Sequence, residues 1–209
     1  MEFKELYTPS TLGKSLSLVD GEWIGHFEEY VLKSAFQPIL SKSLDAIIGY
    51  EGLLRVTKNA LSISPLVFLS RFEKKTEIAN ICGLCASLHL RNFSLAQLKG
   101  KIFLNAHPTM FARISNNSSA IDHAIRRIHL EGLKPENVVW EVTEFKESDE
   151  AHLLQGLSAF KRSGTKIAVD DYGQMASNDA RINLLKPDII KIDRSLILDF
   201  CHNNNPFLI

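Results

Sequence analysis

The stretch VVWEVTE, from Val138 to Glu144, is an apolar run that ends in carboxylates. A buried strand covered by helices reads as continuous Val, Ile and Leu, so a charged side chain near its C-terminal end has no packing rationale. Five more segments of the same kind occur along the chain: AFQPIL (35–40), IIGYEGLLR (47–55), KIFLN (101–105), IAVDD (167–171) and IIKID (189–193). This repetition predicts strands whose ends form a catalytic or metal-binding barrel mouth.

Helix-like segments separate these strands. The candidates lie at 65–72, 77–90, 109–113, 120–129, 150–163 and 179–185. Alternation of this kind with short connections predicts βα units around a mostly parallel sheet, and therefore an α/β fold of the TIM-like (β/α) barrel type. A closed barrel uses eight strands and about 250 residues. The chain has 209 residues and six such strands, which predicts a barrel that is incomplete at its C-terminal end.

The N-terminal part is predicted to stand apart from the barrel. Residues up to about Ser17 are polar and rich in turn formers, which indicates a loosely attached arm. Between residues 22 and 34 the aromatic side chains recur at helical spacing, and Asp20 is placed to cap a helix. We therefore expect an arm and a covering helix over residues 1–35, followed by the barrel domain over residues 36–209.

The composition narrows the class of function. The 24 Lys and Arg residues balance the 24 Asp and Glu residues without a long block of one sign, which argues against a binder of duplex nucleic acid. No apolar stretch resembles a signal sequence or a membrane span, so we expect a cytoplasmic protein with no membrane partner. Cys82 and Cys85 lie in a segment of helical apolar spacing and are interpreted as buried helix residues rather than a zinc or redox pair.

Strand alternation predicts that five polar side chains share the inner face of the barrel. If the larger apolar set on each strand faces the helices, the residues that point inward are Glu51, Asn105, Glu141, Asp170 and Lys191. Three carboxylates that converge in a confined site raise one another's pKa unless a cation accompanies them. Oxygen ligands with one neutral amide suit a hard ion such as Mg²⁺, Mn²⁺ or Ca²⁺.

Asp171 adds a further carboxylate at a strand end and permits a second metal ion. Each residue also has a plain structural interpretation, in which Glu51 pairs with Arg55 and Lys191 pairs with Asp193. Those interpretations require the same coincidence at five strand ends, which favours a functional site.

In this order the segments resemble the EAL-domain family of cyclic-di-GMP phosphodiesterases. The matching motifs are FQPI (36–39), YEGLLR (50–55), NAHP (105–108), WEVTE (140–144), DDYGQ (170–174) and KIDRS (191–195). Gly52 replaces the alanine of the family's namesake motif, and His107, a candidate for lining the mouth, replaces a serine. The resemblance covers about residues 36–196. It implies a TIM-like barrel that hydrolyses one phosphodiester bond of cyclic-di-GMP to give linear pGpG, with Mg²⁺ or Mn²⁺ as cofactor.

The resemblance also implies a role for each site residue of this sequence. The metal ligands would be Glu51, Asn105, Glu141 and Asp170, with Asp171 reaching a second ion. The catalytic set would comprise Glu51, Asp171, Lys191 and Asp193, in which Lys191 orients the attacking water and Asp193 supports the site. Glu144 would anchor the loop after the family's fifth strand. The dinucleotide would contact Gln37, Leu53 and Arg55.

Family members continue into a seventh strand with a Glu-Gly-Val-Glu segment and an eighth strand with a substrate-contacting glutamine. We expect both strands to be missing here, which would leave open sheet edges for a homodimer or a protein partner to cover. The leading hypothesis is a cyclic-di-GMP phosphodiesterase. The alternative is a catalytically inactive homologue that acts as a cyclic-di-GMP receptor or a protein-binding regulator. A third interpretation is a fragment of a longer enzyme.

Overall fold

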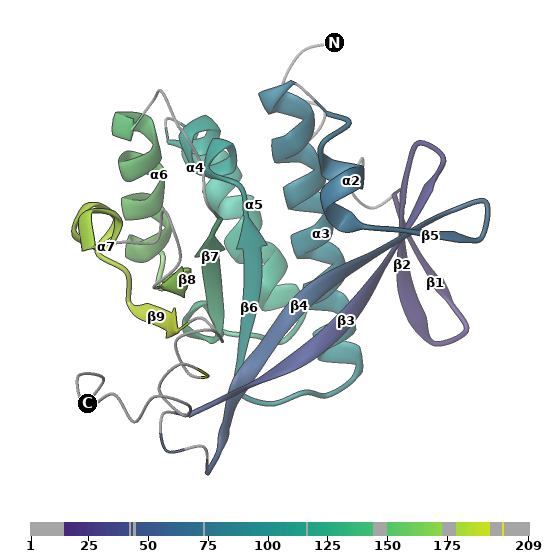
Figure 1. Ribbon diagram of the computed structural model, residues 1–209, viewed down its shortest axis with the longest axis horizontal. Helices are drawn as coiled ribbons and strands as arrows, with labels where there is room; N and C mark the ends of the chain where they lie inside the picture. Colours follow the sequence, from purple (N-terminus) through teal and green to yellow (C-terminus); the bar gives the residue numbers. More distant parts are fainter. Residues whose placement is uncertain are drawn as a thin grey trace.

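The computed structural model describes residues 15–41, 43, 45–72, 74–115, 117–143, 150–172, 179–192 and 198. The backbone of Asp171 is described, but its side chain is not. The described strands form one nine-stranded sheet in the order β1-β2-β3-β4-β6-β7-β8-β9, with β5 paired to β4 (Figure 1). Five of these strands are parallel to one another, and four are joined to them in antiparallel fashion.

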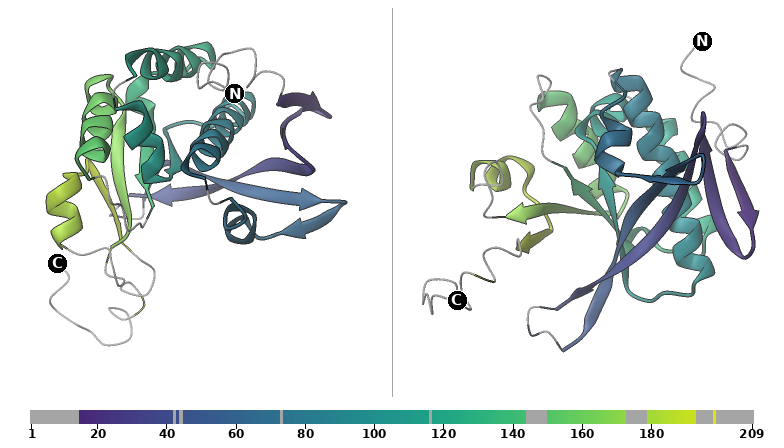
Figure 2. Two further views of the ribbon diagram at one scale, coloured as in Figure 1. Left: turned by 90° about the horizontal axis from the view of Figure 1, so that it is seen from above. Right: turned by 45° about the vertical axis from the view of Figure 1, so that its right-hand side comes forward.

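The parallel part of the sheet alternates with helices, as the sequence predicts. Its strands are β4 (Ile47–Lys58), β6 (Lys101–Ala106), β7 (Val138–Val142), β8 (Lys166–Tyr172) and β9 (Ile189–Ile192). The connecting helices are α3 (Lys75–Leu95), α4 (Pro108–Ile114), α5 (Ser118–Leu130), the 3₁₀ helix η1 (Pro135–Asn137), α6 (Glu150–Arg162) and α7 (Asp179–Leu185). Helices α3 to α6 lie along one side of the curved sheet, which leaves the strand ends free to form a site (Figure 2).

The predicted covering helix is wrong, because residues 22–34 belong to antiparallel strands. The strands are β1 (Leu16–Val19), β2 (Glu22–Phe27) and β3 (Tyr30–Leu40), and a further hairpin adds β5 (Leu61–Ile63) and the short helix α2 (Pro65–Leu69). Asp20 and Gly21 have φ angles of 48° and 79° and form the two-residue turn between β1 and β2. Asp-Gly favours this turn because both positions require a positive φ. Asp20 therefore begins a hairpin and does not cap a helix.

The parallel strands have one apolar layer on each face, and these layers explain why the site residues point inward. On the outer face, Trp140 packs against Phe160 of α6 with their ring centroids 5.1 Å apart. On the inner face, Phe103, Val139 and Ala168 are fully buried and Ile189 packs against them. Each of the four inner residues is followed two positions later by a polar residue of the predicted site. Strand alternation thus carries these polar side chains onto the same inner face.

The described strands do not close on themselves. Within this part of the chain β9 pairs with β8 alone, and the other end of the sheet is β1. The outer-face side chains of Ile190 and Ile192 are 44% and 56% exposed. The expectation that two further strands are missing stays a prediction. No helix among the described residues has the length and apolar character needed to cross a membrane.

Candidate metal centre and active site

Five adjacent strands bring the five predicted inward residues together. Glu51 comes from β4, Asn105 from β6, Glu141 from β7, Asp170 from β8 and Lys191 from β9. Asn105 and Glu141 are direct partners in the β6–β7 register, so their side chains leave the sheet side by side. Since the parallel strands run in one direction, their polar positions meet at one edge of the inner face.

Three carboxylates form the centre of this cluster. One oxygen each from Glu51, Glu141 and Asp170 lies within 4.8 Å of the other two. Asn105 donates a hydrogen bond from Nδ2 to Glu51 Oε1 over 2.9 Å, which orients the Glu51 carboxylate and leaves the Asn105 amide oxygen as a further donor atom. The cluster therefore offers oxygen ligands alone, from three acids and one amide.

Lys191 contacts all three carboxylates. Its Nζ atom hydrogen-bonds Glu51 Oε2 at 2.8 Å, and it lies 2.7 Å from Glu141 Oε1 and 3.0 Å from Asp170 Oδ1. The contact with Glu141 has the distance of an ion pair without the geometry of a hydrogen bond. One ammonium faces three acids, so the ionised cluster keeps an excess of negative charge.

Burial sets the protonation of this cluster. The Glu141 side chain is 1% exposed, and burial raises the pKa of its carboxyl from 4.5 to about 8. The charges of Glu51 and Asp170 also raise this pKa, whereas Lys191 lowers it. Burial alone would lower the pKa of Lys191, but its contacts with Glu141, Glu51 and Asp170 outweigh burial and raise it. The metal-free centre therefore favours a charged lysine and a neutral Glu141.

The donor set fits a hard divalent cation. Both carboxylate oxygens of Glu141 are buried and have no hydrogen-bond partner among the residues that the structure describes. A buried oxygen without a partner is costly, and a bound ion would satisfy it. Carboxylate and amide oxygens suit Mg²⁺, Mn²⁺ or Ca²⁺, and a divalent charge beside Glu141 would favour the ionised form of its carboxyl.

The three predicted dinucleotide contacts lie beside this centre on β3 and β4. Gln37 is the register partner of Glu51 and is exposed. Leu53 and Arg55 follow Glu51 on the same face of β4, so Arg55 is about 13 Å further along the strand. The Arg55 guanidinium is exposed and donates from Nη1 to the carbonyl of Leu54, not to Glu51. Gln37 therefore lies beside Glu51, and Leu53 and Arg55 lie progressively further from the acids along β4.

Three predicted site residues are not placed by the structure. Glu144 and Asp193 lie outside the described residues, and for Asp171 only the backbone, within β8, is described. Their roles as loop anchor, supporting acid and ligand of a second ion stay predictions.

His107, a candidate for the mouth, is the N-terminal cap of α4. The amide of Thr109 donates to His107 Nδ1 over 3.3 Å, and the Thr109 hydroxyl lies 2.9 Å from the same nitrogen. A serine at this position would cap a helix in the same way. The exchange of serine for histidine therefore keeps a capping function.

His89, which the sequence predicts to be a surface or core residue without a ligand role, is a buried histidine near the site. It lies on α3 beneath Gly52, and a Cβ atom on Gly52 would be 2.9 Å from the His89 ring. His89 Nδ1 is 2.8 Å from the Ser34 hydroxyl, and burial together with the charge of Arg55 lowers the pKa of His89 to about 4. Gly52 in the YEGLLR motif is the sequence feature that could have indicated this contact, because a glycine within a strand often marks the close approach of a neighbouring group.

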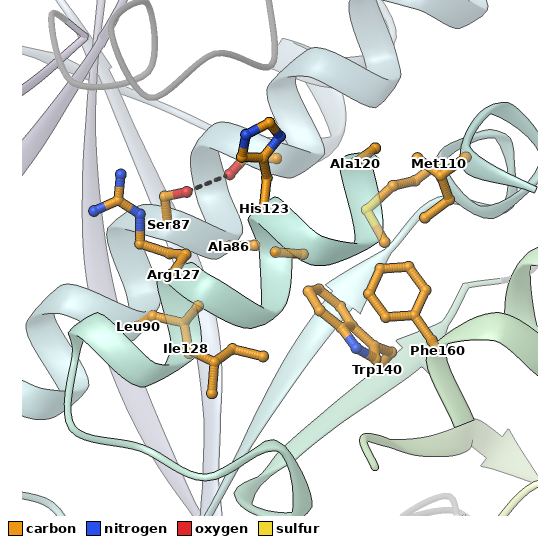
Figure 3. Close-up of a pocket in the computed structure, with 13 residues that line it drawn as sticks. Ala86, Ser87, Leu90, Met110, Ala120, His123, Arg127, Ile128, Trp140 and Phe160 are labelled. Carbon is orange, nitrogen blue, oxygen red and sulfur yellow. Dashed lines mark hydrogen bonds between the residues drawn. The ribbon is translucent and has the colours of Figure 1, made fainter. Parts of the chain in front are cut away.

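A cavity of about 80 Å³ lies elsewhere, between α3 and α5 on the outer side of β7. Small side chains such as Ala86 and Ala120 border it, and Trp140 and Phe160 lie beneath them (Figure 3). None of the residues that line it belongs to the acid cluster, and the lining is mostly apolar. The cavity lacks the carboxylates found at the strand ends, so the candidate active site is the acid cluster and not this cavity.

Comparison with known proteins identifies the family. The model of the EAL domain matches residues 26–209. The chain belongs to the EAL domain family. Its fold is accordingly the TIM-like α/β fold of EAL domains, as the sequence predicts.

Two relatives show how far the likeness extends. The probable cyclic di-GMP phosphodiesterase PdeI of Escherichia coli K12 is 30% identical over 165 residues, which is 76% of this chain and 21% of PdeI. The EAL-domain containing protein YkuI of Bacillus subtilis is 29% identical over 163 residues, 76% of this chain and 39% of YkuI. The chain thus spans less than half the length of either relative.

A solved structure supports the same likeness in three dimensions. The YkuI structure in complex with its substrate c-di-GMP and calcium superposes with a TM-score of 0.65 and 26% identity, over 82% of this chain and 44% of YkuI. The EAL family uses divalent metal ions, in agreement with the acid cluster.

Proposed function

We propose that this EAL domain is a metal-dependent phosphodiesterase that hydrolyses one phosphodiester bond of cyclic-di-GMP to give linear pGpG. The observation that carries the proposal is the convergence of three carboxylates, one amide and one lysine from five adjacent strands. The family membership and the names of PdeI and YkuI support the choice of substrate.

Each side chain has a role in this proposal. Glu51, Asn105, Glu141 and Asp170 would hold Mg²⁺ or Mn²⁺, and Asp171 would reach a second ion. With an ion bound, these residues would place a water molecule of lowered pKa beside the scissile phosphate and offset the negative charge of that phosphate.

The remaining residues position the reactants. The Lys191 ammonium would orient the attacking water and stabilise the charge that develops on the phosphate oxygens. Gln37, Leu53 and Arg55 would bind the dinucleotide along β3 and β4, where the exposed Arg55 guanidinium is able to form paired hydrogen bonds with a phosphate. Asp193 would support the centre, and Glu144 would anchor the following loop.

The direct test follows pGpG by chromatography after incubation of the chain with cyclic-di-GMP and Mg²⁺ or Mn²⁺. We expect turnover that Glu51→Gln abolishes and Glu136→Gln preserves. Glu136 is a suitable control because it is exposed and lies on η1, outside the cluster. A folded wild-type protein that forms no pGpG with either ion would contradict the phosphodiesterase proposal.

A second candidate function is that of a non-hydrolytic cyclic-di-GMP receptor or protein-binding regulator. The exposed outer face of β9 favours it, since β9 has one partner among the described strands and apolar strands at a sheet edge commonly mediate contacts between proteins. A homodimer or another protein would cover that face. Binding of cyclic-di-GMP without turnover, measured by calorimetry with Ca²⁺ and with Mg²⁺, separates this function from the first.

A further inference from the structure

Lys191 occupies a central position among the acids. Its Nζ atom is 2.7 to 3.0 Å from one oxygen of each of Glu51, Glu141 and Asp170. These are the distances of charge-assisted contacts between an ammonium and carboxylates. An ammonium has three N–H donors and no acceptor; Lys191 donates a hydrogen bond to Glu51 and forms ion pairs with all three acids.

An ion bound through the same three oxygens that Lys191 contacts would need the same space. Mg²⁺ holds its oxygen ligands at about 2.0–2.1 Å, so the acids would have to close around a smaller centre than the one the ammonium now spans. The lysine and the ion also carry charge of the same sign. Both cannot sit between the same three oxygens.

We propose that Lys191 is the resident cation of the metal-free centre, and that a divalent ion binds only by displacing its ammonium from the three carboxylates. The inference rests on the ion site of the proposed function, but not on hydrolysis. It assigns two states to one side chain. Lys191 stabilises the acids before the ion arrives and turns toward the reactants afterwards.

Competition of this kind has a definite sign. Removal of the ammonium takes away a competitor, so the ion should bind more tightly to a Lys191→Met variant. Coupling between two ligands of one protein commonly changes affinity by about five- to 150-fold, and we expect a gain of at least about tenfold. The metal-free variant should also have a lower melting temperature, because three acids lose their shared partner.

The first measurement is the dissociation constant of Mn²⁺ by calorimetry, without cyclic-di-GMP, for the wild type, Lys191→Met and Lys166→Met. Lys166 is a matched control, because it pairs with Asp188 outside the cluster. We expect tighter binding in Lys191→Met alone. Unchanged or weaker binding in a folded Lys191→Met protein overturns the proposal, and so does an absence of Mn²⁺ binding in the wild type.

A second measurement uses the wild type and does not depend on the variant folding. Amine labelling mapped by mass spectrometry compares Lys191 with Lys166 in EDTA and in Mn²⁺. We expect Mn²⁺ to raise the labelling of Lys191 severalfold and to leave Lys166 unchanged. Labelling of Lys191 that does not respond to Mn²⁺ overturns displacement. Cyclic-di-GMP turnover enters neither measurement, so failure of the hydrolysis proposal remains a separate result.

Discussion

At the scale of single residues, Glu141 makes the stability of the metal-free protein depend on pH. Burial raises the pKa of its carboxyl from 4.5 to about 8. Between these two pH values the folded protein therefore holds a proton that the unfolded chain releases. The contribution of this proton to the free energy of unfolding is complete below pH 4.5 and is lost as the pH rises through about 8.

We expect the free energy of unfolding in EDTA to fall by on the order of 2 kcal/mol between pH 6 and pH 9 because of this group. Glu141→Gln carries no titrating proton and should remove most of that slope. Urea denaturation of both proteins at the two pH values checks the expectation. Equal slopes in the wild type and in Glu141→Gln would show that another group controls the pH dependence.

The glycine of the EGL motif predicts a second effect at this scale. A Cβ atom on Gly52 would lie 2.9 Å from the ring of His89 and 3.1 Å from its Cβ, so Gly52→Ala forces the buried imidazole to move. We expect a loss of about 1–3 kcal/mol in the free energy of unfolding. His89→Ala makes room for the methyl group, so the same substitution should cost less in that background.

A double-mutant cycle of Gly52→Ala and His89→Ala by chemical denaturation measures this coupling. An equal cost of Gly52→Ala in both backgrounds would mean that His89 is not the reason for the glycine. The expected result would explain why this chain departs from the family's alanine: the space of that methyl group is filled from α3.

At the scale of elements, Asn92 joins α3 to the N-terminal strands. The β2–β3 ladder ends at Gly25 and Leu32, which leaves the backbone of Trp23 without a strand partner on that side. Asn92 Oδ1 accepts from the Trp23 amide at 2.8 Å, and its Nδ2 donates to the Trp23 carbonyl at 2.8 Å. One side chain thus replaces a strand as partner.

We expect Asn92→Ala to lower the free energy of unfolding by about 2–4 kcal/mol, because two backbone groups lose their partners. Asn80→Ala on the same helix is the control, since the Asn80 Oδ1 atom has no hydrogen-bond partner among the described residues. Chemical denaturation of both variants gives the comparison. Similar losses in the two would contradict a bridging role for Asn92.

The elements also show how far the sequence predicts this fold. The parallel strands and their helices follow from apolar runs and helical periodicity, since both patterns are local. The hairpin of β1 and β2 was missed because the aromatic residues of 22–34 fit a helical spacing as well as strands. The turn from β4 to β5 was difficult to predict from the sequence, because Ala60 adopts a φ of 63° that alanine rarely takes.

The candidate site divides in the same way. Strand alternation sufficed to place Glu51, Asn105 and Glu141 on one face, because the period of a strand is fixed. The contacts of Lys191 with three acids depend on how the strands stagger and twist, and the position of His89 depends on the rotation of α3. Neither is written in a short motif.

At the scale of the whole molecule, the outer face of β9 predicts self-association. Ile190 and Ile192 are 44% and 56% exposed on a strand that, among the described strands, has one partner. Exposed apolar side chains at a sheet edge favour contact with another chain. We expect the average mass of the wild type, measured by light scattering, to increase with protein concentration. The variant that combines Ile190→Ser and Ile192→Ser should show a smaller increase.

Leu130→Ser is the control for that experiment, because Leu130 is exposed at the end of α5, away from β9. If both variants lower the mass alike, general hydrophobicity and not the β9 face drives association. Mn²⁺ affinity should stay the same in the β9 variant, because Ile190 and Ile192 lie on the opposite face of the strand from Lys191.

The contact between Lys191 and Glu51 joins residues 140 positions apart. A ribosome adds about 5–20 residues per second, so the acids of β4, β7 and β8 leave it before their lysine, the earliest by on the order of ten seconds. Until then the nascent chain carries the Glu51 carboxylate without its lysine partner. The order of synthesis thus completes this ion pair only when most of the described chain has been made.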